Sequence, residues 1–365
     1  MLLNEDGVGQ GMREVFEEWR PVVDREIERL LPRTIDEEYL SEFFGSARYE
    51  YDSNGIQRAL SDPVWNLLDR GGKRWRAIVF LLLVEGFGED PNEYLQYACI
   101  PEILHNGTII VDDVEDEADM RRGEPALHHI SGKDVALNAG NAMYFFPLKI
   151  LTHNPADLSA ERRLSAYEML MHELNRTHLG QGMDIYWHNK QTIDITEAEY
   201  LEMCACKTGC LGRIVARLAA IVTGQDDATE QTVGEFAELM SVAFQIGDDI
   251  LDIETSDEDG GAFGKAAGND IREGKKTLMV IHAANNASPQ QVARMEEILW
   301  AEENTTEEIE AVVDLLYETG SVDYAREKAR QLSNDARACL QQLDLDPDIV
   351  DQLAAFTRFV IDRNV

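Results

Sequence analysis

The chain has 365 residues, of which 44 % are hydrophobic, so it can bury a sizeable core and is not globally disordered. Its 33 basic and 69 acidic residues leave a formal net charge of −36 at pH 7. A surface this acidic repels nucleic-acid phosphates and anionic membranes, which disfavours both as the main partner. A small anionic substrate remains compatible, because metal ions and local basic clusters invert the field inside a cleft.

The basic residues are divided unequally, with nine Lys against twenty-four Arg. Few lysines among many acids indicate salt adaptation, since at roughly 1 M salt a Debye length of about 3 Å screens surface repulsion. An acidic protein of an ordinary environment is the alternative. The hypothesis is that the fold needs near-molar potassium or sodium chloride, and undiminished thermal stability at low salt would contradict it.

The chain shows no sign of a membrane span or a secretory signal. Its longest apolar run, residues 77–84, is far shorter than the roughly 18 residues of a membrane helix, and the N-terminus has no basic region. Five cysteines, an odd number without disulfide-framework spacing, favour a cytoplasmic, reducing location. We expect Cys204, Cys206 and Cys210 to be buried helix residues, because no His completes a metal site.

In chain order, residues 1–40 are predicted to form an N-terminal amphipathic helical segment, followed by one helical domain over residues 41–365. No internal repeat or low-complexity linker divides the chain. No proline occurs between positions 156 and 288, and apolar residues recur there at helical spacing, so long buried helices are expected. Strand-like alternation is scarce, and the predicted fold class is all-α. The acidic, glycine-rich stretch 255–268 is expected to be a loop and a candidate lid.

The first candidate site is the acidic run at residues 112–116, which reads DDVED. Asp112 and Asp116 stand four residues apart, so they are neighbours on one helix face and repel each other. A hard divalent cation removes that repulsion, and carboxylate oxygens are ligands that Mg²⁺ takes. In a protein this acidic, a solvated acidic face is the competing interpretation. The helix that carries the run is expected to end at Pro125.

The second candidate site is a polar stripe in an otherwise apolar helical segment. Its residues are Gln245, Asp248, Asp249 and Asp252, spaced i, i+3, i+4 and i+7. Carboxylates on a core helix are costly unless they are paired or bind metal. Two such helices facing each other would hold several Mg²⁺ ions, which commonly bridge protein carboxylates to substrate phosphates. The two clusters therefore predict a site for an anionic, phosphate-bearing ligand.

Basic residues occur in short segments that would suit such a ligand. The segments are 71–76 (GGKRWR), 121–123 (RRG), 207–208 (KT), 264–265 (GK) and 274–277 (GKKT). Four of the nine lysines lie in the last three segments, which is not a random surface scatter. Taken singly, each segment is also explained as a turn or as a charge at a helix end.

Together these motifs resemble the trans-type polyprenyl diphosphate synthases, closest to the short-chain geranylgeranyl and farnesyl diphosphate synthases. The resemblance runs over residues 60–363. It includes His105, seven residues before the first acidic cluster, and the segments 180–184 (GQGMD) and 207–211 (KTGCL). Seven blocks in the same order and at similar spacing make the resemblance specific.

The resemblance implies a single-domain bundle of antiparallel helices around a deep central cavity, with the two acidic helices facing each other at its mouth. It implies two or three Mg²⁺ ions per active site, held by Asp112, Asp113, Asp116, Asp248, Asp249 and Asp252. Contacts to the allylic diphosphate or its cation would come from Arg121, Lys207, Thr208, Gln245, Lys265 and Lys275. Isopentenyl diphosphate would bind Lys73, Arg76, His105 and Arg122. The residues expected to carry catalysis are Asp112, Asp116, Asp248, Lys207 and Arg121.

The implied reaction is the Mg²⁺-dependent condensation of isopentenyl diphosphate with an allylic diphosphate. In the family, the residue five before the acidic cluster often sets the cavity floor, and an aromatic residue there stops chain growth. This position is Gly107, beside Thr108 on the side towards the floor. A missing floor favours a twenty-carbon product, with Leu104 or residues 144–146 as deeper stops. Replacing Gly107 by Phe is then expected to shorten the product.

Other functions stay open at this point. A farnesyl or longer-chain synthase, making twenty-five carbons or more, differs only in cavity depth. A non-catalytic regulatory subunit would lack aspartates in one cluster, whereas both are complete here. A class I terpene cyclase would not need Lys73, Arg76 and Arg122. An inert acidic scaffold leaves Asp248 and Asp252 unexplained. The resemblance also implies a homodimer.

Overall fold

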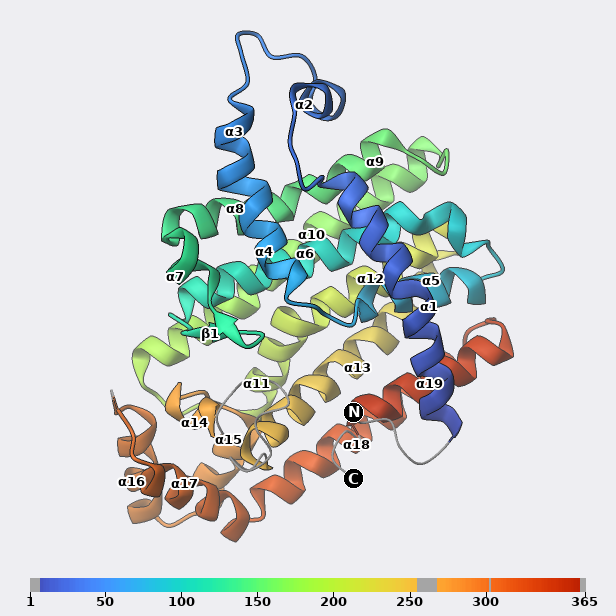
Figure 1. Ribbon diagram of the computed structural model, residues 1–365. Coiled ribbons are helices and arrows are strands. Elements are labelled where there is room, and N and C mark those ends of the chain that lie inside the picture. Colours follow the sequence, from blue (N-terminus) through green and yellow to red (C-terminus); the bar gives the residue numbers. More distant parts are fainter. Residues whose placement is uncertain (1–6, 255–267, 302, 362–365) are drawn as a thin grey trace.

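The computed structural model describes residues 7–254, 268–301 and 303–361, and its regular elements are almost all helices (Figure 1). The all-α prediction is confirmed. The one strand pair in this described part is β1 (Met120–Arg121) with β2 (Glu124–Pro125). The helical elements are α1 (Gly7–Leu30), α2 (Glu37–Phe44), α3 (Ser53–Ile56), η1 (Gln57–Ser61), α4 (Asp62–Asp69), α5 (Trp75–Gly86), η2 (Pro91–Tyr94), α6 (Leu95–Glu115), α7 (Leu127–Ser131), α8 (Lys133–Phe145), η3 (Phe146–Leu148), α9 (Lys149–His153), α10 (Ala160–Lys190), α11 (Glu197–Cys204), η4 (Ala205–Gly209), α12 (Cys210–Thr223), α13 (Asp227–Glu254), α14 (Asn269–Arg272), α15 (Leu278–Asn286), α16 (Pro289–Leu299), α17 (Thr306–Glu318), α18 (Ser321–Leu340) and α19 (Pro347–Ile361).

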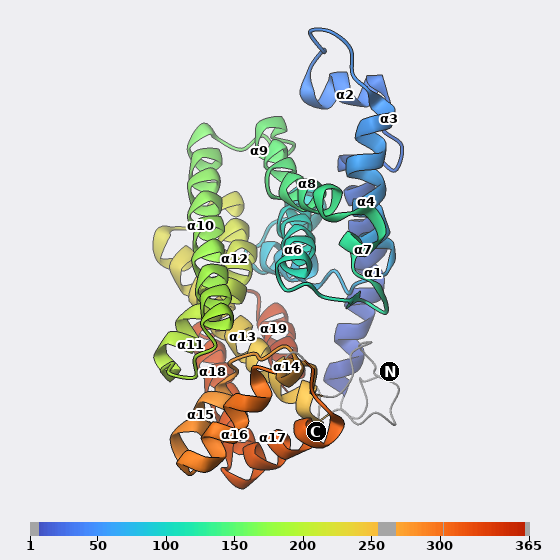
Figure 2. The ribbon, with the colours of Figure 1, turned by 90° about the vertical axis from the view of Figure 1, so that its left-hand side faces the viewer.

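The helices form layers around two hydrophobic clusters. Figure 2 shows α10 and α12 on one side, α6 and α8 in the middle, and α1 with α4 on the other side. The larger cluster gathers side chains from these helices and from α5 and α19, and the smaller one gathers side chains from α11 and α15–α17. Helices α10, α13 and α18 contribute to both clusters, so they tie the two halves of the molecule together.

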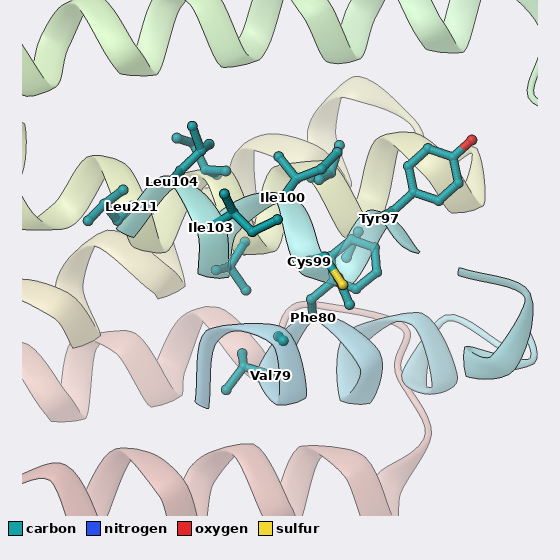
Figure 3. Close-up of a cluster of buried hydrophobic side chains, with 14 of the residues drawn as sticks. Val79, Phe80, Tyr97, Cys99, Ile100, Ile103, Leu104 and Leu211 are labelled. Atoms are coloured by element: carbon teal, nitrogen blue, oxygen red, sulfur yellow. The ribbon is translucent and has the colours of Figure 1, made fainter. Parts of the chain in front are cut away.

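The centre of the larger cluster lies where α5, α6 and α12 meet. Val79 and Phe80 of α5 pack there with Ile103 and Leu104 of α6 and Leu211 of α12, and all are at most 4 % exposed (Figure 3). Burying side chains of this size contributes about 1.5–3 kcal/mol each relative to full exposure. None of the described helices combines the length and the apolarity that a bilayer crossing needs.

The acidic helix α6 ends earlier than the sequence predicted. It stops at Glu115, and the chain then forms the β1–β2 hairpin instead of remaining helical to Pro125. Arg122 and Gly123 at its tip have φ values of 52° and 78°, the left-handed pair that a two-residue hairpin turn needs. The expected helix end at Pro125 is therefore wrong, because glycine at position 123 permits a tight turn that helix periodicity does not reveal.

The basic segment around Lys207 lies in η4, a π-helical turn between α11 and α12. A capping box of Thr196 and Glu199 starts α11. Gly180 of α10 lies directly against η4, where a Cβ atom would come within 2.4 Å of the Lys207 backbone nitrogen. All five cysteines are buried and free, as expected for the three around η4.

The N-terminal region consists of α1, which ends at Leu30, and α2, which begins at Glu37. Val23 and Ile27 of α1 are buried in the larger cluster, so this region shares the core of the rest of the molecule. The predicted loop at 255–268 lies outside the described residues except for Gly268.

Candidate active site

The first acidic cluster lies at the end of α6 and is joined to α10 and η4. Gln181 Nε2 of α10 donates a 2.9 Å hydrogen bond to Asp112 Oδ1. Lys207 Nζ lies 3.1 Å from the same Asp112 oxygen and donates a 2.7 Å hydrogen bond to Asp184 Oδ2. Two carboxylates and one ammonium group from three distant segments therefore meet at one point.

The charges at this point shift one another's ionisation. Burial opposes the ionised form of Asp112, but the adjacent Lys207 ammonium prevails and lowers the pKa of Asp112. Burial likewise disfavours the charged Lys207, yet Asp112 and Asp184 raise its pKa, so it stays protonated. Asp116 keeps solvent access, but the protein atoms around its carboxyl and then the Asp112 charge raise its pKa to about 7. Asp116 is thus the acid that a divalent cation would most readily deprotonate.

Asp113, the second residue of this cluster, bonds to the β1–β2 hairpin and not to Lys207. It is 2 % exposed, and Arg121 Nε donates a 2.7 Å hydrogen bond to its Oδ1 atom. Burial raises the pKa of Asp113 against the opposing charge of Arg121. The hairpin therefore fixes Arg121 beside the acidic cluster, through Asp113.

In the second cluster, Asp249 is held by protein donors. Tyr200 Oη donates a 2.8 Å hydrogen bond to Oδ2, and Gln245 Nε2 donates a 2.9 Å bond to Oδ1. Thr208 Oγ1 in turn donates a 3.1 Å bond to Gln245 Oε1. Burial, and then the Asp270 charge, raise the pKa of Asp249 to about 8. Both Asp249 oxygens already accept hydrogen bonds, so this residue orients the stripe rather than presenting unpaired oxygens.

The last residue of the stripe, Asp252, caps the short helix α14. The Asp270 backbone nitrogen donates a 2.9 Å hydrogen bond to Asp252 Oδ2. Lys275 Nζ lies 3.0 Å from Asp270 Oδ1 and 2.7 Å from Glu273 Oε2. Lys265 lies outside the described residues.

The two acidic clusters are connected through η4, where Lys207 pairs with Asp112 and the next residue, Thr208, bonds to Gln245. The Lys275 charge acts on Asp116 of the first cluster and on Asp249 of the second. The Asp248 charge acts on the buried Arg76. Within the described residues, no three His, Cys, Asp or Glu side chains are close enough to hold an ion by themselves. A divalent ion here would need oxygens from a ligand as well, which fits the way Mg²⁺ joins one or two carboxylates to substrate phosphates.

A basic group of residues lies at the start of α5 and on α6. Arg76 is 6 % exposed, its guanidinium stacks 4.2 Å from the Trp75 ring, and its Nε atom has no hydrogen-bond partner among the described residues. His105 Nδ1 is likewise buried without a described partner. Burial lowers the pKa of Arg76 to about 10, while burial and then the Arg76 charge hold the pKa of His105 well below its usual range. The pair therefore offers a cation and a neutral imidazole to an anionic ligand.

Arg122 completes this basic group from the hairpin tip. Its Nη1 atom donates a 2.7 Å hydrogen bond to the Gly71 carbonyl, and its Nη2 atom donates a 3.0 Å bond to Asn106 Oδ1. Burial, and then the Arg74 charge, lower its pKa to about 10, so it stays charged at neutral pH. Lys73 is exposed on the loop that joins α4 to α5 and contains Gly71.

Four residues with a clear place in the site were not among the predicted site residues. Gln181 and Asp184 stand three apart on α10, and the GQGMD segment was the signal that could have found them. Asp270 lies between two basic segments. Tyr200 carries no local signal, because only its contact with Asp249 reveals its role.

The structure places Gly107 against helix α8. A Cβ atom on Gly107 would lie 2.7 Å from Met143 Cβ and 3.0 Å from the Gly140 carbonyl oxygen of α8. Gly107 is thus a close helix–helix contact and not an open floor, since α6 and α8 cross there. Thr108, partly exposed, donates a 2.8 Å hydrogen bond to the His105 carbonyl.

The fold and the site together define a class of protein: an all-helical chain that brings two aspartate clusters and a group of buried basic residues together. Comparison with known proteins narrows this class. Residues 57–316 match the family model described as polyprenyl synthetase. The chain belongs to this polyprenyl synthetase family, and it is a prenyltransferase of isoprenoid biosynthesis.

Three similar proteins illustrate the relationship. The chain is 33 % identical over 315 residues to a geranylgeranyl pyrophosphate synthase of Geoglobus acetivorans, covering 86 % of this chain and 93 % of the relative. It is 32 % identical over 298 residues to a geranylfarnesyl diphosphate synthase of Natronomonas pharaonis, covering 77 % of this chain and 83 % of that relative. The crystal structure of geranylgeranyl pyrophosphate synthetase from Pyrococcus horikoshii superposes with a TM-score of 0.82 at 26 % identity, covering 96 % and 99 %.

Proposed function

We propose that this enzyme condenses isopentenyl diphosphate with an allylic diphosphate and releases a twenty-carbon product, geranylgeranyl diphosphate. The observation that carries the proposal is that η4 contacts both acidic clusters, since Lys207 pairs with Asp112 at 3.1 Å and Thr208 bonds to Gln245 at 3.1 Å. The basic group of Arg76, His105 and Arg122 is near enough to the second cluster for the Asp248 charge to act on Arg76. Each of the two diphosphate substrates would therefore have its own site, one formed by the acidic clusters and the other by the basic residues.

Two or three Mg²⁺ ions would be held by aspartates of both clusters, which are Asp112, Asp116, Asp248 and Asp252. When bound, such ions neutralise the allylic diphosphate and make it a better leaving group. Asp113 and Asp249 would act in support, because Arg121 and Tyr200 already bond to them. The ammonium groups of Lys207 and Lys275 would contact the diphosphate oxygens.

In the proposed reaction, the acidic clusters hold the allylic diphosphate and the basic group holds isopentenyl diphosphate. The allylic C–O bond breaks, the isopentenyl double bond forms the new C–C bond, and the proton lost from the isopentenyl unit passes to the released diphosphate. Thr208 and Gln245, which bond to each other, would direct their polar atoms at the allylic cation. Arg76, His105 and Arg122, with Lys73, would hold isopentenyl diphosphate. No Ser or Cys nucleophile is required.

The twenty-carbon product is supported by similarity to geranylgeranyl synthases, and a twenty-five-carbon product is the competitor through the Natronomonas relative. Because Gly107 packs against α8, another side chain must limit the product. Tyr144 of α8 is 8 % exposed, and its ring meets the His178 ring of α10 edge-on at 5.8 Å between centroids. We assign product length to this ring.

A homodimer is supported by an exposed apolar stripe along α10. Leu164, Met171, Leu179 and Tyr186 are 57, 46, 65 and 59 % exposed and recur at spacings of seven or eight residues, so they share one face. Phe145 at the end of α8 is 63 % exposed. Light scattering of the Leu179→Glu variant should then show monomers where the wild type shows dimers; an unchanged mass would contradict this interface.

The direct test is incubation with radiolabelled isopentenyl diphosphate and each allylic primer in high-salt Mg²⁺ buffer, followed by chromatography of the dephosphorylated products. A twenty-carbon alcohol as the main labelled product is expected from every shorter primer. A twenty-five-carbon product would contradict the proposed product length but not the proposed substrates. Absence of any elongated product, with the protein folded by circular dichroism, would overturn the proposed substrates.

A further inference from the structure

The loop between α4 and α5 carries an unfavourable backbone conformation at a residue other than glycine. Gly71 and Gly72 have φ values of 96° and 141°, which glycine adopts freely. Arg74, at the N-cap of α5, has a φ of 53° and a ψ of 28°, the left-handed region that side chains disfavour. A non-glycine residue keeps this conformation only when its surroundings hold it, and such strain clusters at functional sites.

The Arg74 side chain is turned into the protein, where three helices hold it. It is 5 % exposed, and its Nε atom donates a 2.7 Å hydrogen bond to Asp24 Oδ1 of α1. Its Nη2 atom donates a 3.1 Å bond to the Leu68 carbonyl of α4. Its Nη1 atom lies 3.7 Å from Glu102 Oε1 of α6. The strained residue is thus fastened by its own guanidinium group.

The contacts continue from Glu102 back to the loop. Asn106 Nδ2 donates to the Glu102 carbonyl at 2.8 Å, and Asn106 Oδ1 accepts a 3.0 Å bond from Arg122 Nη2. Arg122 Nη1 then donates a 2.7 Å bond to the Gly71 carbonyl. A Cβ atom on Gly72 would lie 2.8 Å from Arg74 Nη1 and 3.7 Å from Arg122 Nη1. The polar contacts therefore surround the loop from Gly71 to Arg74.

The charge of Asp24 matters because this region is otherwise rich in cations. Arg74, Arg76 and Arg122 all act on His105, and Arg74 also acts on Arg122. Asp24 and Glu102 are the acids that pair with the Arg74 guanidinium. Removing the Asp24 charge would leave the buried Arg74 cation paired with Glu102 alone, which raises the free energy of this conformation. The loop would then shift so that Arg74 regains solvent.

We propose that Asp24 and Arg74 are positioning residues, which hold the loop at 71–74 and the start of α5 in the conformation that presents Lys73 and Arg76 to isopentenyl diphosphate. The inference rests on the proposed function, since it takes that pocket as the isopentenyl site. Helix α1 lies outside the stretch 57–316 that matches the family model. An N-terminal helix would then act on substrate binding without touching substrate.

The test compares Asp24→Asn, Asp24→Glu and the matched control Glu28→Gln. Glu28 is on the same helix, and its exposed carboxylate pairs with Arg33 at 3.3 Å instead of with Arg74. We expect Asp24→Asn to raise the KM for isopentenyl diphosphate about tenfold, with kcat and the KM for the allylic substrate within twofold of wild type. Asp24→Glu should restore most of the loss, and Glu28→Gln should match wild type.

Hydrogen exchange gives a second readout that needs no turnover. In the substrate-free protein, backbone amides of residues 73–76 should exchange faster in Asp24→Asn than in wild type or Glu28→Gln. Unchanged exchange in this loop, or equal changes in both KM values, would overturn the inference. A wild-type enzyme that fails to elongate any primer would instead overturn the proposed function, whatever the exchange pattern.

Discussion

Lys207 and Asp112 form an ion pair between η4 and α6, with 3.1 Å between Nζ and Oδ1. Their side chains are 23 and 27 % exposed, so solvent screens the pair less than it screens a surface salt bridge. The same ammonium also bonds to Asp184, and one cation thereby holds two acids together near the expected diphosphate site. Ligand binding would require this cation to share its hydrogen bonds with phosphate oxygens.

Replacing Lys207 by Met should lower kcat about 10²–10³-fold, the usual cost of removing one group that stabilises charge in a transition state. The charge is lost while the length of the side chain is kept. Steady-state kinetics with saturating substrates measure the effect. Lys133→Met removes an exposed lysine that pairs with Glu117 at 2.7 Å and should leave kcat unchanged. A Lys207→Met enzyme within twofold of wild type would refute the role.

Substituting Asp112 or Asp248 by Ala should each cost about 10²–10³-fold or more in rate, because each removes an oxygen that would bind Mg²⁺. Both variants should also need more Mg²⁺ for half-maximal activity. Glu117→Gln, an exposed acid just beyond the first cluster, is the control and should behave as wild type. Normal turnover by Asp112→Ala would rule out the metal assignment.

Gly180→Ala should both destabilise the fold and impair the site. The new methyl group would lie 2.4 Å from the Lys207 backbone nitrogen, and overpacking of this kind costs about 1–3 kcal/mol. The displaced η4 would also carry Lys207 away from Asp112. Gly182→Ala on the same helix meets nothing within 4 Å and should be neutral or slightly stabilising. Chemical denaturation compares the two, and equal stabilities would contradict the close contact.

His105 makes the stability of the fold depend on pH. Because its pKa lies well below the usual range in the folded state, only the unfolded chain takes up its proton below about pH 6.5. The contribution of His105 to stability is therefore present above that pH and is lost as the pH falls, by at most about 1.4 kcal/mol per pH unit. Urea denaturation at pH 7.5 and 5.5 should show a smaller loss for His105→Gln than for wild type. His188→Gln, at an exposed position, should keep the wild-type loss.

Tyr144→Ala should lengthen the product towards twenty-five carbons, because it removes a buried ring between α8 and α10. Asn141→Ala, exposed on the same helix, should leave the product at twenty carbons. Gly107→Phe is now expected to destabilise the α6–α8 contact rather than shorten the product cleanly. Chromatography of the dephosphorylated products measures the product length. An unchanged product of Tyr144→Ala would mean that another residue limits chain growth.

Local spacing was enough to predict the helical class and the composition of both acidic clusters. An i, i+4 or i+7 interval fixes which side chains share a helix face, so Asp112 and Asp116, or Gln245 and Asp249, could be paired from the sequence. The short motifs likewise pointed to the family before any contact was known. These features depend on neighbours within two helical turns, where backbone geometry leaves few alternatives.

Contacts between distant segments were decided only by the tertiary structure. Tyr200 reaches Asp249 across 49 residues, and Gly107 faces Met143 because α6 and α8 cross at that point. The early end of α6 also depends on distant contacts, since Arg122 in the hairpin turn bonds to Gly71 and Asn106. Helix periodicity says which residues share a face, but not which helix that face will meet. That choice depends on the packing of the whole core, to which every helix contributes at once.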